Sequence, residues 1–241
     1  CAVRLRGAVD HGALLNAVRF VCARHEVLRT CFAMVEGELR QRVSSECVVA
    51  VVETAIDEHD DADIALDALL REDMSRPFDL ENGLPVRALL CDLGARDVVL
   101  ALTMHHIASD GQSVEVLSRE VLTRYRGQSL PHLDMQYRDF ASWQNELLST
   151  GLMQTHREHW MRTLGGELPV LDLPTDRPRA GHPSFAGGRV WLEFNETELL
   201  GLKSLGARGR GTLFMTLLAL VKVLVYRYTG QRDLLVGSPV S

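Results

Sequence analysis

The chain has 241 residues, of which 46% are hydrophobic and 24% are charged, and its formal net charge is −6. This composition is typical of a globular protein, and the length allows one large domain or two small ones. The net charge is acidic, and the sequence lacks the clusters of basic residues that are typical of nucleic-acid-binding proteins. We therefore expect no nucleic-acid partner. The longest apolar stretch, 213–225, contains Lys222 and is too short to cross a bilayer, so we expect no membrane contact.

The first half of the chain alternates between strand-like and helix-like patterns. A strand-like segment at 1–5 precedes a helix at 10–26, for which Asp10 is a suitable N-cap. Residues 28–35 and 38–43 predict a hairpin around Glu36 and Gly37. The following predicted elements are a strand at 48–52, a helix at 60–74, and two paired strands at 86–92 and 98–104.

The second half is mainly helical. We predict helices at 112–125, 137–148 and 152–164, then a linker at 171–188 that is rich in proline and glycine. Beyond the linker the pattern predicts a strand at 189–194, helices at 197–207 and 212–228, and a strand at 234–236. This mixed order predicts an α/β fold of the layered α+β type. Tyr137 and Trp143 share one face of their helix, which favours a place in the core.

A short bend joins the strand at 98–104 to the helix that starts near residue 112. It reads HHIASDG, with His105, His106, Asp110 and Gly111 as its notable residues. Histidine is the usual general base near neutral pH, and the start of a helix offers unpaired N–H groups. Glycine permits a backbone conformation or a close approach that a side chain blocks. These parts suit acyl transfer.

Two simpler interpretations of the bend stay open. Paired histidines in a loop are often polar residues with satisfied hydrogen bonds. They can also bind a metal, but adjacent side chains at the end of a strand point to opposite faces, which disfavours shared coordination by His105 and His106. The five cysteines are odd in number, have no CxxC spacing and lie mostly among apolar residues, which indicates reduced thiols and a cytoplasmic location.

The bend and five other segments resemble the condensation domains of nonribosomal peptide synthetases. HHIASDG matches the HHxxxDG signature of that family. The other similar segments, in the order of the family, are RHEVLRT (24–30), PFDLENGLPVR (77–87), YRDFASWQ (137–144), LPTDRPR (173–179) and TGQRDLLVGSPV (229–240). Gln112 departs from the pattern, since tryptophan usually follows the DG pair.

The resemblance implies a fold like that of chloramphenicol acetyltransferase. It implies an N-terminal lobe at 1–170 that carries HHxxxDG, an inter-lobe linker at 171–188, and the incomplete start of a similar C-terminal lobe at 189–241. The family's motifs before residue 1 and after residue 241 are missing, so we expect a chain truncated at both ends. We also expect that these residues alone do not catalyse the reaction.

The resemblance further implies formation of a peptide bond between two thioesters. A donor acyl or peptidyl group passes to the amine of an acceptor aminoacyl group, and phosphopantetheine arms of upstream and downstream carrier proteins hold both. An adenylation domain of the same synthetase is a further implied partner. By position His106 is the catalytic histidine, His105 and Asp110 have structural roles, and Gly111 lines the substrate tunnel. No metal and no directly bound cofactor are implied.

Several assignments within the superfamily stay open. The sequence details are closest to the class that joins two L-configured units, and classes that take a D-configured donor or a fatty-acyl starter stay open. The alternatives are an epimerisation domain, a CoA-dependent acyltransferase and a recruitment module without catalytic activity. For Asp110 we expect an arginine from the missing segment as the partner in the full protein. In these residues alone we expect backbone N–H groups or an arginine already present. We interpret the charges of the 24–30 segment as holding the corner between a helix and a strand.

Overall fold

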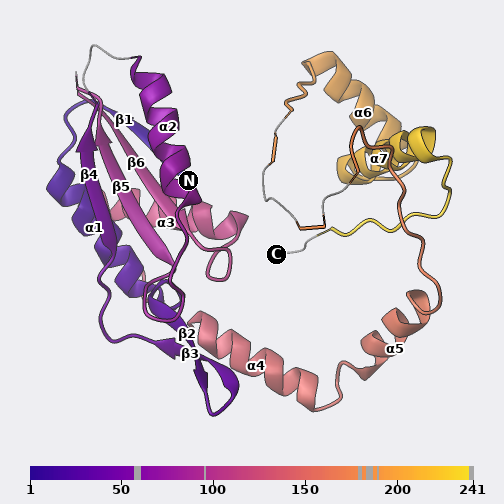
Figure 1. Ribbon diagram of the computed structural model, residues 1–241, viewed down its shortest axis with the longest axis horizontal. Coiled ribbons are helices and arrows are strands. Elements are labelled where there is room, and N and C mark those ends of the chain that lie inside the picture. The colour runs from indigo at the N-terminus through magenta and orange to yellow at the C-terminus, as the bar shows by residue number, and fades with distance from the viewer. Residues whose placement is uncertain (57–60, 95, 179–180, 183–186, 189, 239–241) are drawn as a thin grey trace. The chain divides into compact units, whose positions relative to one another are not determined.

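The computed structural model describes residues 1–56, 61–94, 96–178, 181–182, 187–188 and 190–238. By its internal contacts the chain forms two compact units, Cys1–Gln154 and Thr155–Val240. Figure 1 shows the elements of each unit. The lobe boundary that we expect near residue 170 stays a prediction, as does the role of 171–188 as a linker.

A four-stranded sheet is the centre of the first unit. Its strands are β1 (Ala2–Arg6), β4 (Ala50–Ala55), β5 (Val86–Asp92) and β6 (Asp97–Met104), in the order β1-β6-β5-β4. Only the β4–β5 pair is parallel. The two central strands are buried on both faces, as their continuous apolar sequences predict. The predicted strand at 48–52 begins two residues later and extends to residue 55.

Helices cover both faces of this sheet. The helices α1 (His11–Arg24) and α3 (Gly111–Tyr125) share one core with residues such as Leu90 and Leu100, and the two helices also pack on each other. Their sequence neighbours Cys91 and Val99 point to the opposite face of the sheet, where α2 (Ala62–Ser75) packs. Burying each large apolar side chain of this core contributes about 1.5–3 kcal/mol. Asp10 caps α1 as predicted, by accepting a hydrogen bond from the Ala13 amide.

A separate hairpin follows α1. Its strands are β2 (Thr30–Val35) and β3 (Glu38–Val43), joined by a turn in which Glu36 and Gly37 both have positive φ angles. Two successive positive φ values match the right-handed twist of paired strands, which explains the glycine. The hairpin is confirmed, although its first strand starts at residue 30 because Glu26–Arg29 forms a short 3₁₀ helix, η1.

Two helices follow the sheet, α4 (Tyr137–Ser149) and α5 (Gln154–Thr163). The expectation of core positions for Tyr137 and Trp143 is wrong within the described residues, because 52% and 55% of their surfaces are exposed. Each ring packs on the ring of Phe140 instead, with centroids 5.9 and 5.6 Å apart. The helical spacing predicted their common face correctly, but helical spacing does not say what covers that face.

The second unit contains α6 (Glu196–Arg208) and α7 (Leu213–Thr229), both as predicted. The predicted strands at 189–194 and 234–236 are wrong: the described residues 190–194 and 234–236 have irregular backbone and join no sheet. An apolar run becomes a strand only beside a partner strand. Among the described helices, none alone is long and apolar enough to cross a membrane, and only α6 with α7, bent by 96°, passes that test as a pair.

Candidate active site

The histidine bend is held between a buried central strand and the start of a helix. The strand β6 ends at Met104, and the His105 amide then donates to the Pro85 carbonyl at 2.9 Å. Ala108, in the middle of the bend, is buried in the main core. The helix α3 starts at Gly111, one residue earlier than the sequence predicts. The backbone of the two histidines is therefore fixed by strand pairing, core packing and helix capping.

His105 belongs to the scaffold of the bend. Its Nδ1 lies 3.0 Å from the Ile107 amide nitrogen, which is a donor, so Nδ1 is the accepting nitrogen. Its ring packs edge-on against Phe78, with centroids 6.0 Å apart and an interplanar angle of 89°. His105 is half-buried, and these two contacts hold its ring against the bend and the Phe78 loop.

His106 has a different environment. The residue is exposed, and its Nδ1 lies 2.6 Å from the carbonyl oxygen of Ser109. A carbonyl only accepts, so Nδ1 carries the proton, and the neutral ring then has its lone pair on Nε2. This tautomer leaves Nε2 able to take a proton from a bound group. His105 and His106 contact different partners, as expected for adjacent side chains at a strand end.

Asp110 is the N-cap of α3. Its Oδ1 accepts hydrogen bonds from the Ser113 amide at 2.8 Å and the Ser113 hydroxyl at 2.7 Å, while Ser113 Oγ accepts from the Asp110 amide. The hydrogen bond from the Ser113 hydroxyl, followed by that from the Ser113 amide, lowers the pKa of the Asp110 carboxyl below its usual range. The Asp110 carboxylate itself is exposed.

Gly111 is exposed at the first position of α3. Its φ is outside the left-handed region, and a Cβ built on it meets no atom within 4 Å among the described residues. The described residues therefore give no reason of backbone angle or packing for a glycine at this position. The glycine leaves open space at the helix start, five residues after His106.

A pocket of about 280 Å³ lies beside the bend, between the end of α1 and the first turns of α3. Apolar side chains such as Leu28 and Val116 form part of its wall, and Asp110, Gln112 and Ser113 add polar groups. Gln112 is thus a pocket residue at the position where the resemblance leads us to expect tryptophan. A larger pocket lies in the second unit, far from these residues in sequence, and contains none of the predicted site residues.

Sequence reasoning missed a buried carboxylate behind this pocket. Glu120 of α3 is buried, and its Oε2 lies 2.8 Å from His25 Nε2 and 3.3 Å from Arg24 Nε. His25 also lines the pocket. The signal was present in the sequence, because an acid stands in the apolar stripe of a helix, but its partners come from a segment 95 residues away.

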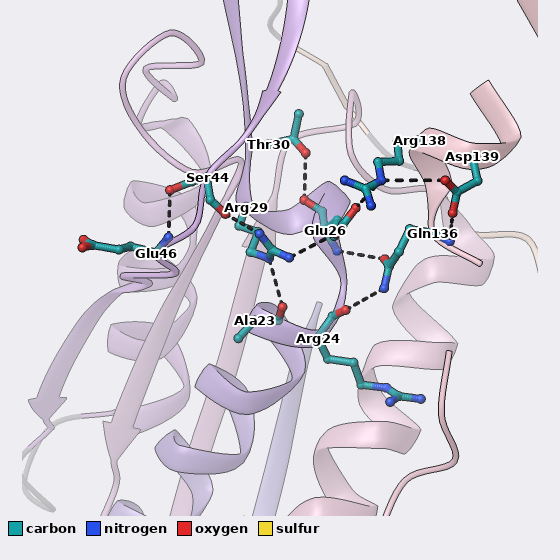
Figure 2. A network of polar contacts seen from close by, with 10 residues as sticks. All are labelled: Ala23, Arg24, Glu26, Arg29, Thr30, Ser44, Glu46, Gln136, Arg138 and Asp139. Atoms are coloured by element: carbon teal, nitrogen blue, oxygen red, sulfur yellow. Dashed lines mark hydrogen bonds and ion pairs between the residues drawn. The ribbon is translucent and has the colours of Figure 1, made fainter. Parts of the chain in front are cut away.

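The 24–30 segment holds the corner between α1 and β2, as we predicted from its charges. Figure 2 shows Glu26 at the centre of this network. The Glu26 carboxylate pairs with Arg29 at 3.3 Å and with Arg138 at 3.1 Å. The Gln136 side chain accepts from the Glu26 amide and donates to the Arg24 carbonyl, which joins the corner to the start of α4.

No group of three histidine, cysteine or acidic side chains that could hold a metal occurs among the described residues. The bend presents an exposed imidazole in one tautomer, a capped helix start and an open glycine position. Burial raises the pKa of the Cys22 thiol to about 12, so this thiol is a weak candidate for a nucleophile near neutral pH.

Known proteins are similar to this chain along its whole length. The family model for the condensation domain matches residues 1–241. Tyrocidine synthase 3 of Brevibacillus parabrevis is 40% identical over 240 residues, which is 100% of this chain and 4% of that protein. The chain therefore spans only a small part of this curated relative.

Solved structures share the fold. The X-domain from teicoplanin biosynthesis has a TM-score of 0.83 at 30% identity, over 94% of this chain and 52% of that one. The epimerization domain from the third module of tyrocidine synthetase B has a TM-score of 0.63 at 22% identity, over 75% and 43%, which shows the fold alone. The sheet with its two helical layers, the bend after β6 and the full-length match lead to one conclusion: this chain belongs to the condensation domain family.

Proposed function

We propose that His106 assists formation of a peptide bond between two thioesters held on carrier proteins. The observation that supports this most directly is the His106 tautomer: Nδ1–H donates a hydrogen bond to the Ser109 carbonyl, so Nε2 is the basic nitrogen on an exposed bend. The acceptor amine attacks the thioester carbon of the donor and forms the C–N bond. The nitrogen loses a proton toward Nε2, the C–S bond breaks, and the departing thiolate takes up a proton.

The remaining site residues have supporting roles in this proposal. His105 holds the backbone of the bend through Ile107, and Asp110 caps the helix that the bend leads into. Gly111 leaves room for the thioester to approach beside the helix start. None of these three groups exchanges a proton with the substrate in the proposed reaction.

The substrates and partners follow from the same proposal. Phosphopantetheine arms of an upstream and a downstream carrier protein bring the donor and the acceptor, and an adenylation domain of the same synthetase activates the amino acid. The domain binds no cofactor of its own, works in the cytoplasm and joins two L-configured units. Residues 1–170 form the N-terminal lobe, 171–188 the linker, and 189–241 the beginning of the C-terminal lobe.

The test uses the full-length protein with donor and acceptor aminoacyl groups loaded on carrier proteins. We expect His106→Ala to lower the rate of dipeptidyl thioester formation by about 10²–10⁴-fold, the usual contribution of a positioned base. The matched control is His132→Ala, which removes a histidine whose side chain is 87% exposed in a loop. Equal rates for wild type and His106→Ala would refute the assignment of His106.

The same assay separates the alternatives. A racemised donor without a new amide indicates epimerisation, and full efficiency with acyl-CoA in place of the donor carrier indicates a CoA-dependent acyltransferase. Carrier binding with neither reaction indicates a recruitment module. The fold does not choose between these, because the epimerization domain shares it.

A further inference from the structure

A buried ion pair lies behind the histidine bend, on the face of the sheet that α2 covers. Arg87 of β5 has a side chain that is only 6% exposed, and its Nε donates to Asp73 Oδ1 at 2.9 Å. Its Nη2 donates to the carbonyl oxygens of Asp73 and Arg76. Thr103 of β6 donates to the other Asp73 oxygen. A guanidinium with so many partners is fixed in position.

An aromatic ring stacks on this fixed guanidinium. The Cζ of Arg87 lies 4.2 Å from the centroid of the Phe78 ring, which is the geometry of a cation–π contact. Phe78 lies in the loop between α2 and β5, where helix or strand pairing does not fix its side chain. The stacked guanidinium is therefore the contact that sets the plane of the ring.

The Phe78 ring in turn meets His105. The two rings are perpendicular, at 89°, with centroids 6.0 Å apart. The same His105 ring accepts the Ile107 amide on Nδ1, and Ile107 directly follows His106. A continuous series of contacts thus runs from the buried Asp73–Arg87 pair through Phe78 and His105 to the backbone of the bend.

We propose that Arg87 and Phe78 are positioning residues that act through His105 to fix the direction in which His106 faces. This proposal rests on the proposed function of His106. Arg87 is buried and Phe78 contacts the His105 ring, so we assign both residues an indirect role. A rotation of the His105 ring releases the Ile107 amide, and the bend then has one hydrogen bond fewer to define the position of His106. A small displacement of a reacting group costs far more in rate than in binding.

The substitution that tests this is Phe78→Leu, which keeps apolar volume and removes the ring. We expect kcat for condensation in the full-length protein to fall by about 10-fold to 100-fold, with KM within about twofold of wild type. Arg87→Lys keeps the charge beside Asp73 but loses the planar stack, so we expect a fall in kcat of the same direction. Rates are compared per folded protein, measured by circular dichroism at the assay temperature.

The chain offers a matched control. Arg124 lies over the Phe20 ring at 4.5 Å, so Phe20→Leu removes the same kind of contact at a place that is not connected to His105. We expect Phe20→Leu to leave kcat and KM unchanged. A loss of kcat in Phe20→Leu as large as in Phe78→Leu would overturn the proposal, because the effect would then be general.

A double-mutant cycle identifies the route. His105→Asn places an amide oxygen near the position of Nδ1 and removes the ring that Phe78 contacts. If Phe78 acts through His105, then Phe78→Leu lowers kcat less than about twofold in the His105→Asn background, because coupled residues are not additive. An undiminished effect of Phe78→Leu in that background contradicts the route.

A readout without turnover keeps this test separate from the proposed reaction. Hydrogen exchange of the Ile107 amide reports the bond to His105 directly, and we expect exchange to be faster in Phe78→Leu and unchanged in Phe20→Leu. Unchanged exchange in Phe78→Leu overturns the positioning role. Faster exchange together with full activity of His106→Ala refutes the proposed function alone.

Discussion

The Asp110 carboxylate serves the helix that follows it. We expected an arginine or backbone N–H groups as its partner, and Ser113 supplies both an N–H and an O–H. A carboxylate at the N-terminus of a helix is also favoured by the helix dipole. Its lowered pKa therefore connects the protonation state of one exposed side chain to the stability of α3.

This connection predicts a pH dependence. A group whose pKa is lower in the folded state stabilises the fold above its unfolded pKa, about 3.9, and loses that contribution as the pH falls through the folded pKa. We expect Asp110→Asn to have a lower melting temperature than wild type at pH 7 and an equal one below the folded pKa. Calorimetric melts across this range measure the difference, and a difference that persists at the lowest pH would contradict the charge effect.

Gly111 gives a second prediction for a single residue. Because an added Cβ meets open space and φ is not left-handed, Gly111→Ala should leave the melting temperature unchanged or raise it. Condensation should nevertheless slow, since the methyl group occupies the space that we assign to the thioester. The control is Gly83→Ala, whose Cβ would lie 2.8 Å from the Asp79 carbonyl and should destabilise the fold. Full activity of Gly111→Ala would show that no substrate approaches there.

In the corner between α1, β2 and α4, Glu26 is far more buried than its ion-pair partner Arg138. The Glu26 side chain is 14% exposed and meets two arginines, whereas the Arg138 side chain is 61% exposed. Glu26→Ala should lower the free energy of unfolding by about 1–3 kcal/mol, because it removes the carboxylate that the half-buried Arg29 pairs with. Arg138→Ala should cost about 0–1 kcal/mol. Urea unfolding measures both, and equal losses would show that the network has no centre.

The elements differ in how far the sequence could predict them. The central strands and the helices α1, α3, α6 and α7 follow from local patterns of apolar residues and caps. The segments at 190–194 and 234–236 look equally strand-like, but a strand depends on a neighbour that local sequence does not contain. The prediction of core positions for Tyr137 and Trp143 is wrong for the same reason. Helical periodicity indicates which residues share a face, but it does not indicate whether another element covers that face.

The site shows the same division. HHIASDG predicts the bend, the helix start and the separate surroundings of the two histidines. It does not predict that Ser113 caps with Asp110, that Glu120 lies behind His25, or that Phe78 meets His105. The last two contacts join groups far apart in the sequence, whose geometry is set by the packing of α1, α2 and α3 on the sheet. The cap is local, and it depends on the start of α3 at Gly111.

At the scale of the whole molecule, the exposure of α7 is unusual for a helix of its composition. The helix is apolar around its whole circumference, and such a helix is normally buried. Here Phe214 and Leu224 are 59% and 56% exposed. We therefore expect residues 1–241 in isolation to bind a hydrophobic dye strongly and to form no dipeptidyl thioester. The full-length protein, measured in parallel, should show weak dye binding and full activity, and equal behaviour of the two would refute this expectation.

The position of β1 in the sheet has a consequence for synthesis on the ribosome. Ala2 pairs with Ala101, so the strand that borders β6 is translated long before its partner exists. At about 5–20 residues per second, the interval is roughly 5–20 s. For that time β1 has no edge to join, and the sheet closes only when the strand leading into the histidine bend emerges. The active-site strand is thus also the piece whose arrival completes the sheet.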